Sequence, residues 1–434
     1  MENKVYIGLS LDIIHHGHIN LINNAKKFGH LTVGLLTDAA IASNKKLPLL
    51  NYNQRKKILQ SLNGIDRIVP QNEWDYSINI IKYKPDLMVH GDDWKKDENG
   101  KVLRKNAILA LSKIGSKLVE IPHTKSISSS SLQKRFFEQS QLSSRNGKYL
   151  ERLIKSKDII RIIETHSPLS ALIAENIFYI NKNGDKAEFD GFWSSSLTDS
   201  TLKGKPDIEI LDLNQRLLNI NEIFDVTTKP LIMDIDTGGK IEHFSINCKI
   251  IDRNAISAII MEDKTGLKKN SLFGTEVKQK QESIKNFTDK IITGKKLTQG
   301  NMMIISRIES LILGKPVSDA LNRAEKYLAA GSDGIMIHSK SNNPKEIFQF
   351  SKKFKKLFPD IPLVSVPSSY NQVREKQLIN EGFNVVIYAN HMLRAAYPAM
   401  QKVAYDILKN KRSYESDKNL LSIKKILNLI PGTK

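Results

Sequence analysis

The chain has 434 residues, of which 40% are hydrophobic and 26% are charged, the ordinary balance of a globular fold. That length predicts two or three domains. No apolar run reaches the ~18 residues that a membrane span needs, and the first residues lack a signal-peptide pattern. The single cysteine, Cys248, excludes an internal disulfide, so we expect a cytoplasmic protein. Because no apolar run is long enough to span a bilayer, we expect no membrane partner.

The positive charge of the chain is spread along its length. The formal net charge is +20, with 21 basic and 13 acidic residues in 1–140 and 45 and 33 in the remainder. Nucleic-acid-binding proteins concentrate basic residues on one face or tail. We therefore expect no nucleic-acid partner, and we assign the excess charge to attraction of anionic small substrates.

The first 90 residues alternate between strand and helix patterns. An apolar strand over 3–9 precedes a helix that starts near His18. The pattern continues with strand 31–36, helix 53–62, strand 66–69, helix 75–82 and strand 86–90. This alternation predicts a Rossmann-like parallel sheet covered on both faces, which binds ligands at the carboxyl ends of its strands.

A histidine motif stands where the first strand meets its helix. In His15-His16-Gly17-His18, the glycine lets the backbone approach a phosphate at a helix N-terminus, where free N–H groups favour anions. A lone histidine there would more often cap the helix or lie on the surface. Three further polar motifs accompany it, at 52–56 (Y-N-Q-R-K), 91–94 (G-D-D-W) and 127–131 (I-S-S-S-S).

Together these motifs resemble the glycerol-3-phosphate cytidylyltransferases, over about residues 4–136. The resemblance implies that His15 and His18 stabilise charge on the α-phosphate of CTP while an acceptor oxygen attacks and pyrophosphate leaves with Mg²⁺. It also implies nucleotide or acceptor contacts from Lys46, Arg55, Asp92, Trp94, Ser128, Ser129 and Ser130. Asn44 and His123 replace a lysine and an arginine of the family, so its glycerol phosphate acceptor is not carried over. A non-catalytic nucleotide-binding module is the alternative.

Composition divides the chain after this unit. We expect a cytidylyltransferase-like domain over 1–140, a polar linker over 141–157 with a short helix from about Lys148, and a second domain over 158–434. Eight apolar segments with helical patterns between them predict a (β/α)8 TIM-type barrel: 158–163, 189–193, 230–234, 257–261, 302–306, 334–338, 362–366 and 385–389. A surface hairpin or loop is expected at 179–188.

Polar side chains end four of these segments: Asp234 and Asp236, then Glu262 to Lys264, then Arg307 with Glu309, and His338. Because the carboxyl ends of barrel strands share one face, we expect one site there. Asp234 and Asp236 are two residues apart, so in a strand both would point to the same side. Hard carboxylate oxygens of this kind suit Mg²⁺.

The run Glu262-Asp263-Lys264 followed by Asn270-Ser271 resembles the phosphoenolpyruvate mutase branch of the isocitrate lyase superfamily, over about 155–430. Lyase relatives carry a catalytic cysteine in this loop, whereas Cys248 lies outside it. The resemblance implies interconversion of phosphoenolpyruvate and phosphonopyruvate beneath a loop that closes over the substrate.

The resemblance also implies a role for each site residue. The metal is assigned to Asp234, Asp236 and Glu262. The phosphoryl group and loop closure are assigned to Asp207, Lys268, Asn270, Ser271, Arg307 and His338. The substrate carboxylate is assigned to Trp193, Ser195, Ser196 and Leu197. Ser196 replaces a glycine that is usual in the family.

Fusion of these two domains, in this order, is typical of the bifunctional enzymes of fosfomycin and related phosphonate biosynthesis. It implies CTP and a phosphonate such as 2-hydroxyethylphosphonate as substrates, Mg²⁺ as cofactor, and a homo-oligomer, either dimer or tetramer. A phosphonopyruvate hydrolase is the alternative for the barrel, and the intact Asn270-Ser271 pair argues against it.

Overall fold

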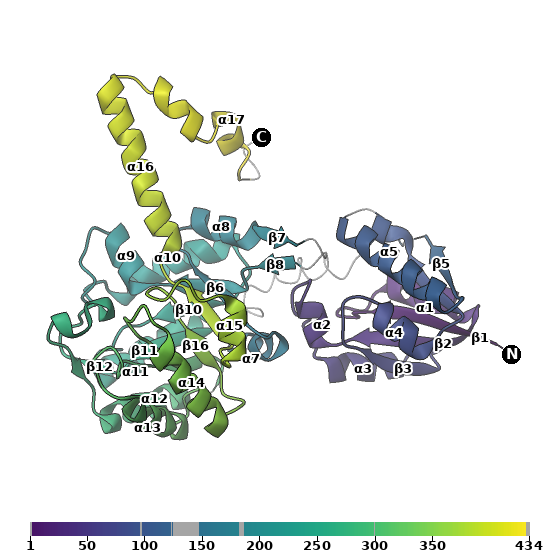
Figure 1. Cartoon of the computed structure of the whole chain (residues 1–434), viewed down its shortest axis with the longest axis horizontal. Helices are drawn as coiled ribbons and strands as arrows, with labels where there is room; N and C mark the ends of the chain where they lie inside the picture. The colour runs from purple at the N-terminus through teal and green to yellow at the C-terminus, as the bar shows by residue number, and fades with distance from the viewer. Residues whose placement is uncertain are drawn as a thin grey trace.

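A computed structural model describes residues 2–95, 98–122, 124, 147–181, 186–298 and 300–430. The chain forms two lobes, an N-terminal sheet domain and a barrel, with one long helix that projects from the barrel (Figure 1). Within the described residues, no helix combines the length and the apolar character needed to cross a membrane.

The N-terminal lobe is a parallel sheet in the order β3-β2-β1-β4-β5. Its strands are β1 (Asn3–Leu9), β2 (Gly29–Leu36), β3 (Arg67–Gln71), β4 (Leu87–Gly91) and β5 (Lys117–Ile121). Its helices are α1 (His16–Lys26), α2 (Asp38–Ala42), α3 (Tyr52–Gln60), α4 (Ser77–Tyr83) and α5 (Glu98–Lys113). Val5, Tyr6 and Ile7 are all fully buried, as expected for a central strand covered on both faces.

The second lobe is a closed barrel of parallel strands in the order β10-β11-β14-β15-β16-β17-β6-β9. The strands are β6 (Ile160–Glu164), β9 (Gly191–Ser194), β10 (Leu231–Asp234), β11 (Ala258–Glu262), β14 (Met303–Ile308), β15 (Gly334–Ile337), β16 (Leu363–Ser365) and β17 (Val385–Tyr388). Each overlaps one of the eight apolar segments, so the predicted barrel is confirmed.

Helices connect the barrel strands and bury their apolar stripes against them. They are α8 (Pro168–Asn176), α9 (Ser196–Leu202), α10 (Leu213–Val226), α11 (Ile241–Arg253), α12 (Ile284–Thr298), α13 (Val317–Ala329), α14 (Lys345–Leu357) and α15 (Glu375–Asn380). The expected surface hairpin is present, because β7 (Phe178–Ile180) and β8 (Lys186–Glu188) pair antiparallel.

The helix α7 (Gly147–Ser156) closes the amino end of the barrel. Leu150 and Leu153 join the apolar cluster that fills the barrel interior with Ile160 and Ile232. The backbone N–H of Gly147 donates to the carbonyl of Asn301 at 2.6 Å. The helix expected from about residue 148 is therefore present, but it packs as part of the barrel rather than as a linker; residues 141–146 lie outside the described part of the chain.

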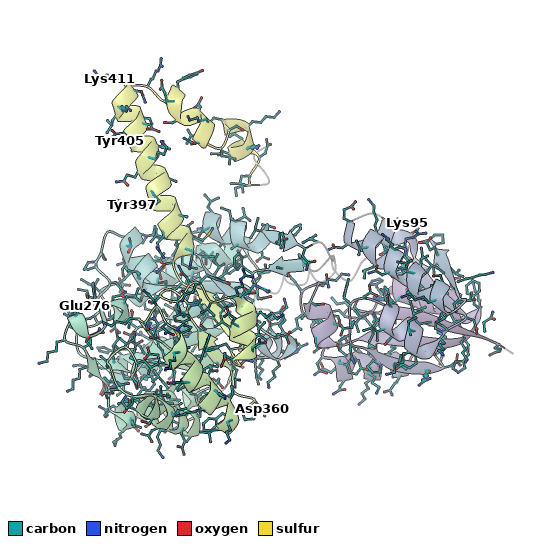
Figure 2. The ribbon with its side chains drawn as sticks, viewed as in Figure 1. Lys95, Glu276, Asp360, Tyr397, Tyr405 and Lys411 are labelled. Carbon is teal, nitrogen blue, oxygen red and sulfur yellow. The ribbon has the colours of Figure 1, made fainter. Side chains whose placement is uncertain are left out.

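The chain ends in α16 (His391–Asn410), a turn of 3-10 helix (Tyr414–Asn419) and α17 (Ile423–Leu427). Figure 2 shows Tyr397 and Tyr405 on α16, which extends away from the barrel to Lys411. No residue of α16 is buried within this chain.

Candidate active sites

The first site lies at the carboxyl ends of the barrel strands. Parallel strands bring their ends to one face, so residues from distant segments meet there. They surround a cavity of about 60 Å³ whose lining includes Trp193, Ser195, Ser196, Leu197, Asp207, Asp234, Glu262, Lys268, Asn270, Ser271, Arg307 and His338. All the residues expected in the barrel site except Asp236 line this cavity.

The loop after β11 is closed over the cavity. The Lys268 ammonium donates to Asp207 Oδ1 at 2.6 Å and to Ser196 Oγ at 2.8 Å, and it also contacts the carboxylate of Asp236. The Asn270 amide donates to Asp207 Oδ2 at 2.8 Å. Asp207 therefore accepts hydrogen bonds from two side chains of the loop, Lys268 and Asn270.

The base of this loop is fixed to the barrel. The short strands β12 (Lys264–Thr265) and β13 (Lys280–Gln281) pair antiparallel. The buried Asp263 carboxylate accepts bonds from the Glu309 backbone at 2.9 Å and from the Tyr327 hydroxyl at 2.8 Å. Asp263 therefore fixes the base of the loop to the barrel, whereas the neighbouring Glu262 lines the cavity.

Arg307 is the centre of a buried polar cluster in the cavity lining. Arg307 Nη2 donates to Ser271 Oγ at 2.6 Å and to His338 Nδ1 at 3.1 Å, and Arg307 also pairs with Glu309. His338 Nδ1 also lies 3.4 Å from Glu309 Oε1, so this ring nitrogen stands between the guanidinium and the carboxylate. Burial, followed by the charge of Arg307, lowers the pKa of His338, so this imidazole is neutral. The cluster offers a fixed positive charge beside a neutral imidazole, which suit a phosphoryl group.

Two buried carboxylates of the cavity have the chemistry of metal ligands. Glu262 is 1% exposed, neither of its oxygens accepts a hydrogen bond from the described residues, and burial raises its pKa to about 7. Asp234 is also buried; although burial opposes ionisation, Lys268 and Arg307 hold its pKa below the usual value. The Glu262 oxygens lie 3.3 Å from Arg307 Nη2 and 3.4 Å from Lys264 Nζ without hydrogen-bond geometry, whereas Asp234 accepts from the Ser196 hydroxyl at 2.9 Å. The loosely held Glu262 carboxylate beside Asp234 fits a divalent cation that keeps several waters, as Mg²⁺ does.

Asp236 departs from the expected geometry. The strand ends at Asp234, and Asp236 has a left-handed backbone with φ of 56°, so the two carboxylates are not related as neighbours on one strand face. Asp236 pairs instead with Lys268. Over the described residues, no three acidic, histidine or cysteine side chains converge as a ready metal cage. Of the three carboxylates expected to hold the metal, Asp234 and Glu262 line the cavity.

Arg216, which lies beneath the site, was missed in the sequence. Arg216 is 6% exposed and donates to Asp199 Oδ2 at 2.8 Å, to the Ser194 carbonyl at 3.2 Å and to the Asp234 carbonyl. It thereby joins the ends of β9 and β10. Nothing in its local sequence, L-N-Q-R-L-L, distinguishes it from a surface arginine on a helix.

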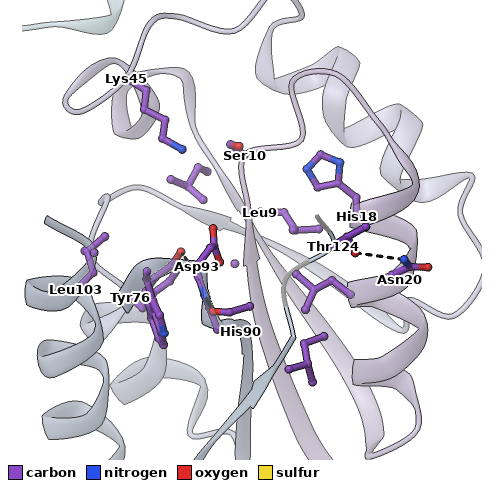
Figure 3. Close-up of a pocket in the computed structure, with 18 of the residues that line it drawn as sticks. Leu9, Ser10, His18, Asn20, Lys45, Tyr76, His90, Asp93, Leu103 and Thr124 are labelled. Carbon is purple, nitrogen blue, oxygen red and sulfur yellow. Dashed lines mark hydrogen bonds between the residues drawn. The ribbon is translucent and has the colours of Figure 1, made fainter. Parts of the chain in front are cut away.

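The second site is a cavity of about 720 Å³ at the carboxyl ends of the N-terminal strands (Figure 3). His15 and His18 line it, with ring centroids 4.0 Å apart. A side chain at Gly17 would come within 2.9 Å of the His15 ring, so this position requires glycine. Burial lowers the pKa of His18 to about 4, and this ring is therefore neutral at pH 7.

Aromatic rings form the other end of this cavity. Trp94 stacks on His90 with centroids 3.8 Å apart and an angle of 6° between the planes. The Tyr76 hydroxyl lies 3.2 Å from His90 Nε2. These flat surfaces suit a planar base. His90 and Tyr76 were not anticipated, since nothing in their local sequence marks them.

Three of the contacts expected in this cavity need correction, and a fourth group lies outside the described residues. The guanidinium of Arg55 is fully buried in an ion pair with Asp38 and does not line the cavity. Asp93 rather than Asp92 lines it. Lys46 points to the barrel, 3.0 Å from Glu175, and Lys45 lines the cavity instead. The expected phosphate contacts Ser128, Ser129 and Ser130, together with His123, lie outside the described residues.

Comparison with known proteins assigns both halves of the chain. Residues 150–408 match the family described as phosphoenolpyruvate phosphomutase. The chain belongs to the phosphoenolpyruvate phosphomutase family. Residues 6–135 match the cytidylyltransferase-like family, so the chain also carries a cytidylyltransferase-like domain.

Individual relatives agree with this assignment. The chain is 32% identical to a phosphoenolpyruvate phosphomutase of Tetrahymena pyriformis (66% of this chain, 92% of the relative) and 33% identical to a phosphonopyruvate hydrolase of Variovorax sp. strain Pal2 (64% and 93%). Its N-terminal part is 36% identical to a glycerol-3-phosphate cytidylyltransferase of Bacillus spizizenii (21% and 73%).

Two solved structures resemble the barrel. One is a phosphoenolpyruvate phosphomutase from Streptomyces platensis subsp. rosaceus, with a TM-score of 0.60, 31% identity, and coverage of 66% of this chain and 95% of that chain. The other is a phosphonopyruvate hydrolase in complex with oxalate and Mg²⁺, with a TM-score of 0.57, 31% identity, and coverage of 65% and 94%.

Proposed function

We propose that this chain is a bifunctional enzyme of phosphonate biosynthesis. Its barrel interconverts phosphoenolpyruvate and 3-phosphonopyruvate, and its N-terminal domain transfers CMP from CTP to a phosphonate. The observation that carries the barrel assignment is the closed loop, in which Lys268 and Asn270 both reach Asp207 while Ser271 reaches Arg307. A cavity at the strand ends that a loop covers, with Arg307 in its lining, suits transfer of a phosphoryl group without loss to water.

Different residues of the barrel site have different roles in the rearrangement. Arg307 and His338 hold the oxygens of the migrating phosphoryl group, and Asn270 closes the cavity above it. The donors of residues 193–197 hold the substrate carboxylate. Mg²⁺, held by Asp234 and Glu262, would supply positive charge for the enolate oxygens. Magnesium in a relative of the same fold supports this assignment.

A phosphonopyruvate hydrolase is the competing assignment, because such an enzyme is as similar to this chain as the mutase is. The bond from Asn270 to Asp207 favours the mutase, because it holds the loop over the cavity and a closed loop excludes water. Phosphonopyruvate and Mg²⁺ should be followed by ³¹P NMR. We expect the phosphonate resonance to be replaced by that of phosphoenolpyruvate; free phosphate in its place would identify the hydrolase.

The N-terminal domain is proposed to use CTP. Support comes from the adjacent rings of His15 and His18 beside the aromatic end of a cavity of about 720 Å³. Its acceptor is proposed to be 2-hydroxyethylphosphonate, or 2-aminoethylphosphonate, in preference to glycerol 3-phosphate, because Asn44 leaves one lysine fewer to meet a phosphate ester. One charged contact is worth about 1–3 kcal/mol, so the discrimination is modest.

Pyrophosphate release from CTP with each of the three acceptors tests this assignment. A preference for glycerol 3-phosphate would exclude the phosphonate acceptor. Titration with CTP that shows binding, without pyrophosphate release from any acceptor, would identify a nucleotide-binding module without catalytic activity.

A cytoplasmic homo-oligomer is also proposed. On α16, Tyr397, Met400 and Leu408 are between 61% and 79% exposed, which is unusual for apolar side chains on a long helix (Figure 2). A second copy of the chain is the simplest cover for this face. Light scattering should give a dimer or tetramer, and a chain ending at residue 390 should be monomeric.

A further inference from the structure

The loop that joins α2 to α3, residues 43–50, belongs to both lobes. We call it the shared loop. Its first part lines the N-terminal cavity through Asn44 and Lys45, and Figure 3 shows Lys45 directed toward Ser10. Its second part turns to the barrel, where Leu47 is 1% exposed and packs in one cluster with Tyr149 and Leu150 of α7. A loop that lines a site in one domain is therefore anchored in the core of the other.

Lys46 forms the first polar anchor. Its ammonium lies 3.0 Å from Glu175 Oε1 of α8 and also contacts the Thr228 hydroxyl, which donates to the same carboxylate at 2.8 Å. Burial opposes ionisation of Glu175, but Lys46 and Lys229 keep its pKa below the usual value, so the carboxylate is charged. Lys46 thus connects the shared loop to the barrel and turns away from the cavity that Lys45 faces.

Arg152 of α7 forms the second anchor. Its guanidinium donates to the carbonyls of Pro48 and Leu49 at 2.9 and 3.0 Å and to Asp38 Oδ2 at 3.3 Å. Backbone carbonyls bonded to a side chain of another domain fix the path of the loop itself.

This anchor continues to the cavity wall. Asp38 Oδ1 accepts from Arg55 at 2.7 Å, and Arg55 in turn donates to the carbonyl of Ser10, which lines the cavity. The Leu49 backbone N–H donates to Asp12 Oδ1 at 2.7 Å. The chain of bonds therefore runs from the barrel, through the shared loop and α2, to the segment between β1 and the histidine motif.

We propose that the barrel positions the acceptor side of the N-terminal site, with Glu175 and Arg152 as positioning residues and Lys46 as their link, while Lys45 is the lysine that meets the acceptor. This inference rests on the proposed nucleotidyl transfer for its kinetic readout. It explains why Lys46 stands at a family lysine position and yet points out of the cavity. It also gives the barrel a structural role in a reaction that it does not catalyse.

Charge exchange across the Lys46–Glu175 pair tests the proposal in the full-length chain. K46E and E175K should each raise the KM for the phosphonate acceptor about fivefold, since a partly exposed ion pair is worth up to ~1 kcal/mol, with kcat changed less than KM. The double variant K46E/E175K should recover to within about twofold of the wild type. Mutase kcat/KM should stay unchanged throughout, because Glu175 does not line the barrel cavity.

Two controls complete the experiment. K155E reverses an exposed charge on α7 that pairs with Glu151 of the same helix, and it should have no effect. K45A should raise the same KM, and E175K should not restore it. A double variant no better than K46E alone would show that Lys46 itself is an acceptor ligand, and an E175K variant with wild-type KM would refute positioning by the barrel.

Hydrogen exchange separates this proposal from the proposed function. If the wild type releases no pyrophosphate from CTP, the nucleotidyl transfer assignment fails. The anchor is then judged by exchange of peptides that cover 43–50, which should be faster in E175K and return to the wild-type rate in the double variant. Equal exchange in all variants would overturn the anchor.

Discussion

Asp207→Asn tests the closed loop most sharply. The Asp207 side chain is 8% exposed and bonds Lys268 at 2.6 Å and Asn270 at 2.8 Å. Asparagine retains the shape and one acceptor oxygen, so the bond from Asn270 survives, but the ion pair with Lys268 is lost. A hydrogen bond to a charged group is worth about 1.5–3 kcal/mol, which corresponds to about a 10-fold to 150-fold loss of mutase kcat/KM.

The rate is measured as phosphoenolpyruvate formed from phosphonopyruvate, coupled to pyruvate kinase and lactate dehydrogenase. Omission of ADP reveals pyruvate that arises by hydrolysis. Asp207→Ala removes both bonds and should abolish turnover, while Glu222→Gln changes an exposed acid on α10 and should have no effect. Pyrophosphate release by the N-terminal domain should be unchanged. If Asp207→Asn retains kcat/KM within about threefold of the wild type, Asp207 does not hold the loop.

Three further predictions follow from other contacts. Ser196→Gly removes a hydroxyl that accepts from Lys268 and donates to Asp234, and it should raise mutase KM about threefold to tenfold; an unchanged KM would contradict this role. A chelator should abolish mutase activity. Glu262→Gln should raise the Mg²⁺ concentration at half-maximal rate at least about tenfold, since loss of a metal ligand or of a residue that orients one lowers metal affinity on that scale. The same Mg²⁺ dependence in this variant and the wild type would exclude Glu262 as a metal ligand. Burial lowers the pKa of His18 to about 4 in the folded chain, whereas a histidine in the unfolded chain has a pKa of about 6.5. As pH falls from about 6.5 toward 4, the unfolded chain therefore binds a proton that the folded chain does not, and the N-terminal domain loses stability. His18→Asn should flatten that decrease in thermal unfolding, and an identical pH profile would contradict the buried, neutral ring.

The architecture was predictable because it depends on local patterns. Each barrel strand is an apolar run that is buried on both faces, and the helices between them keep a regular spacing. Parallel topology then brings the polar strand ends together, so residues as distant as Trp193 and His338 were assigned to one site from the sequence and line one cavity.

The remaining errors concern contacts between distant segments and local backbone geometry. Lys45 and Lys46 are equivalent in the sequence, and only a carboxylate 129 residues away distinguishes them. Arg216 acquires its role from β9 and β10, which its own helix does not reveal. Asp236 was placed on a strand face, but the strand ends two residues earlier, where a left-handed turn redirects the carboxylate to Lys268.

The central claim is that the closed barrel site carries a phosphoryl group from oxygen to carbon without admitting water. It is tested most directly by turnover of phosphonopyruvate with Mg²⁺ in water enriched in ¹⁸O. Mass spectrometry should find no ¹⁸O in the three terminal phosphoryl oxygens of phosphoenolpyruvate and no labelled inorganic phosphate, because the group never meets solvent beneath Lys268 and Asn270. The enol oxygen is left out of the comparison, since the ketone of phosphonopyruvate exchanges its own oxygen with water. Phosphate that carries ¹⁸O, formed at the rate at which phosphonopyruvate disappears, would contradict the claim and make the barrel a hydrolase.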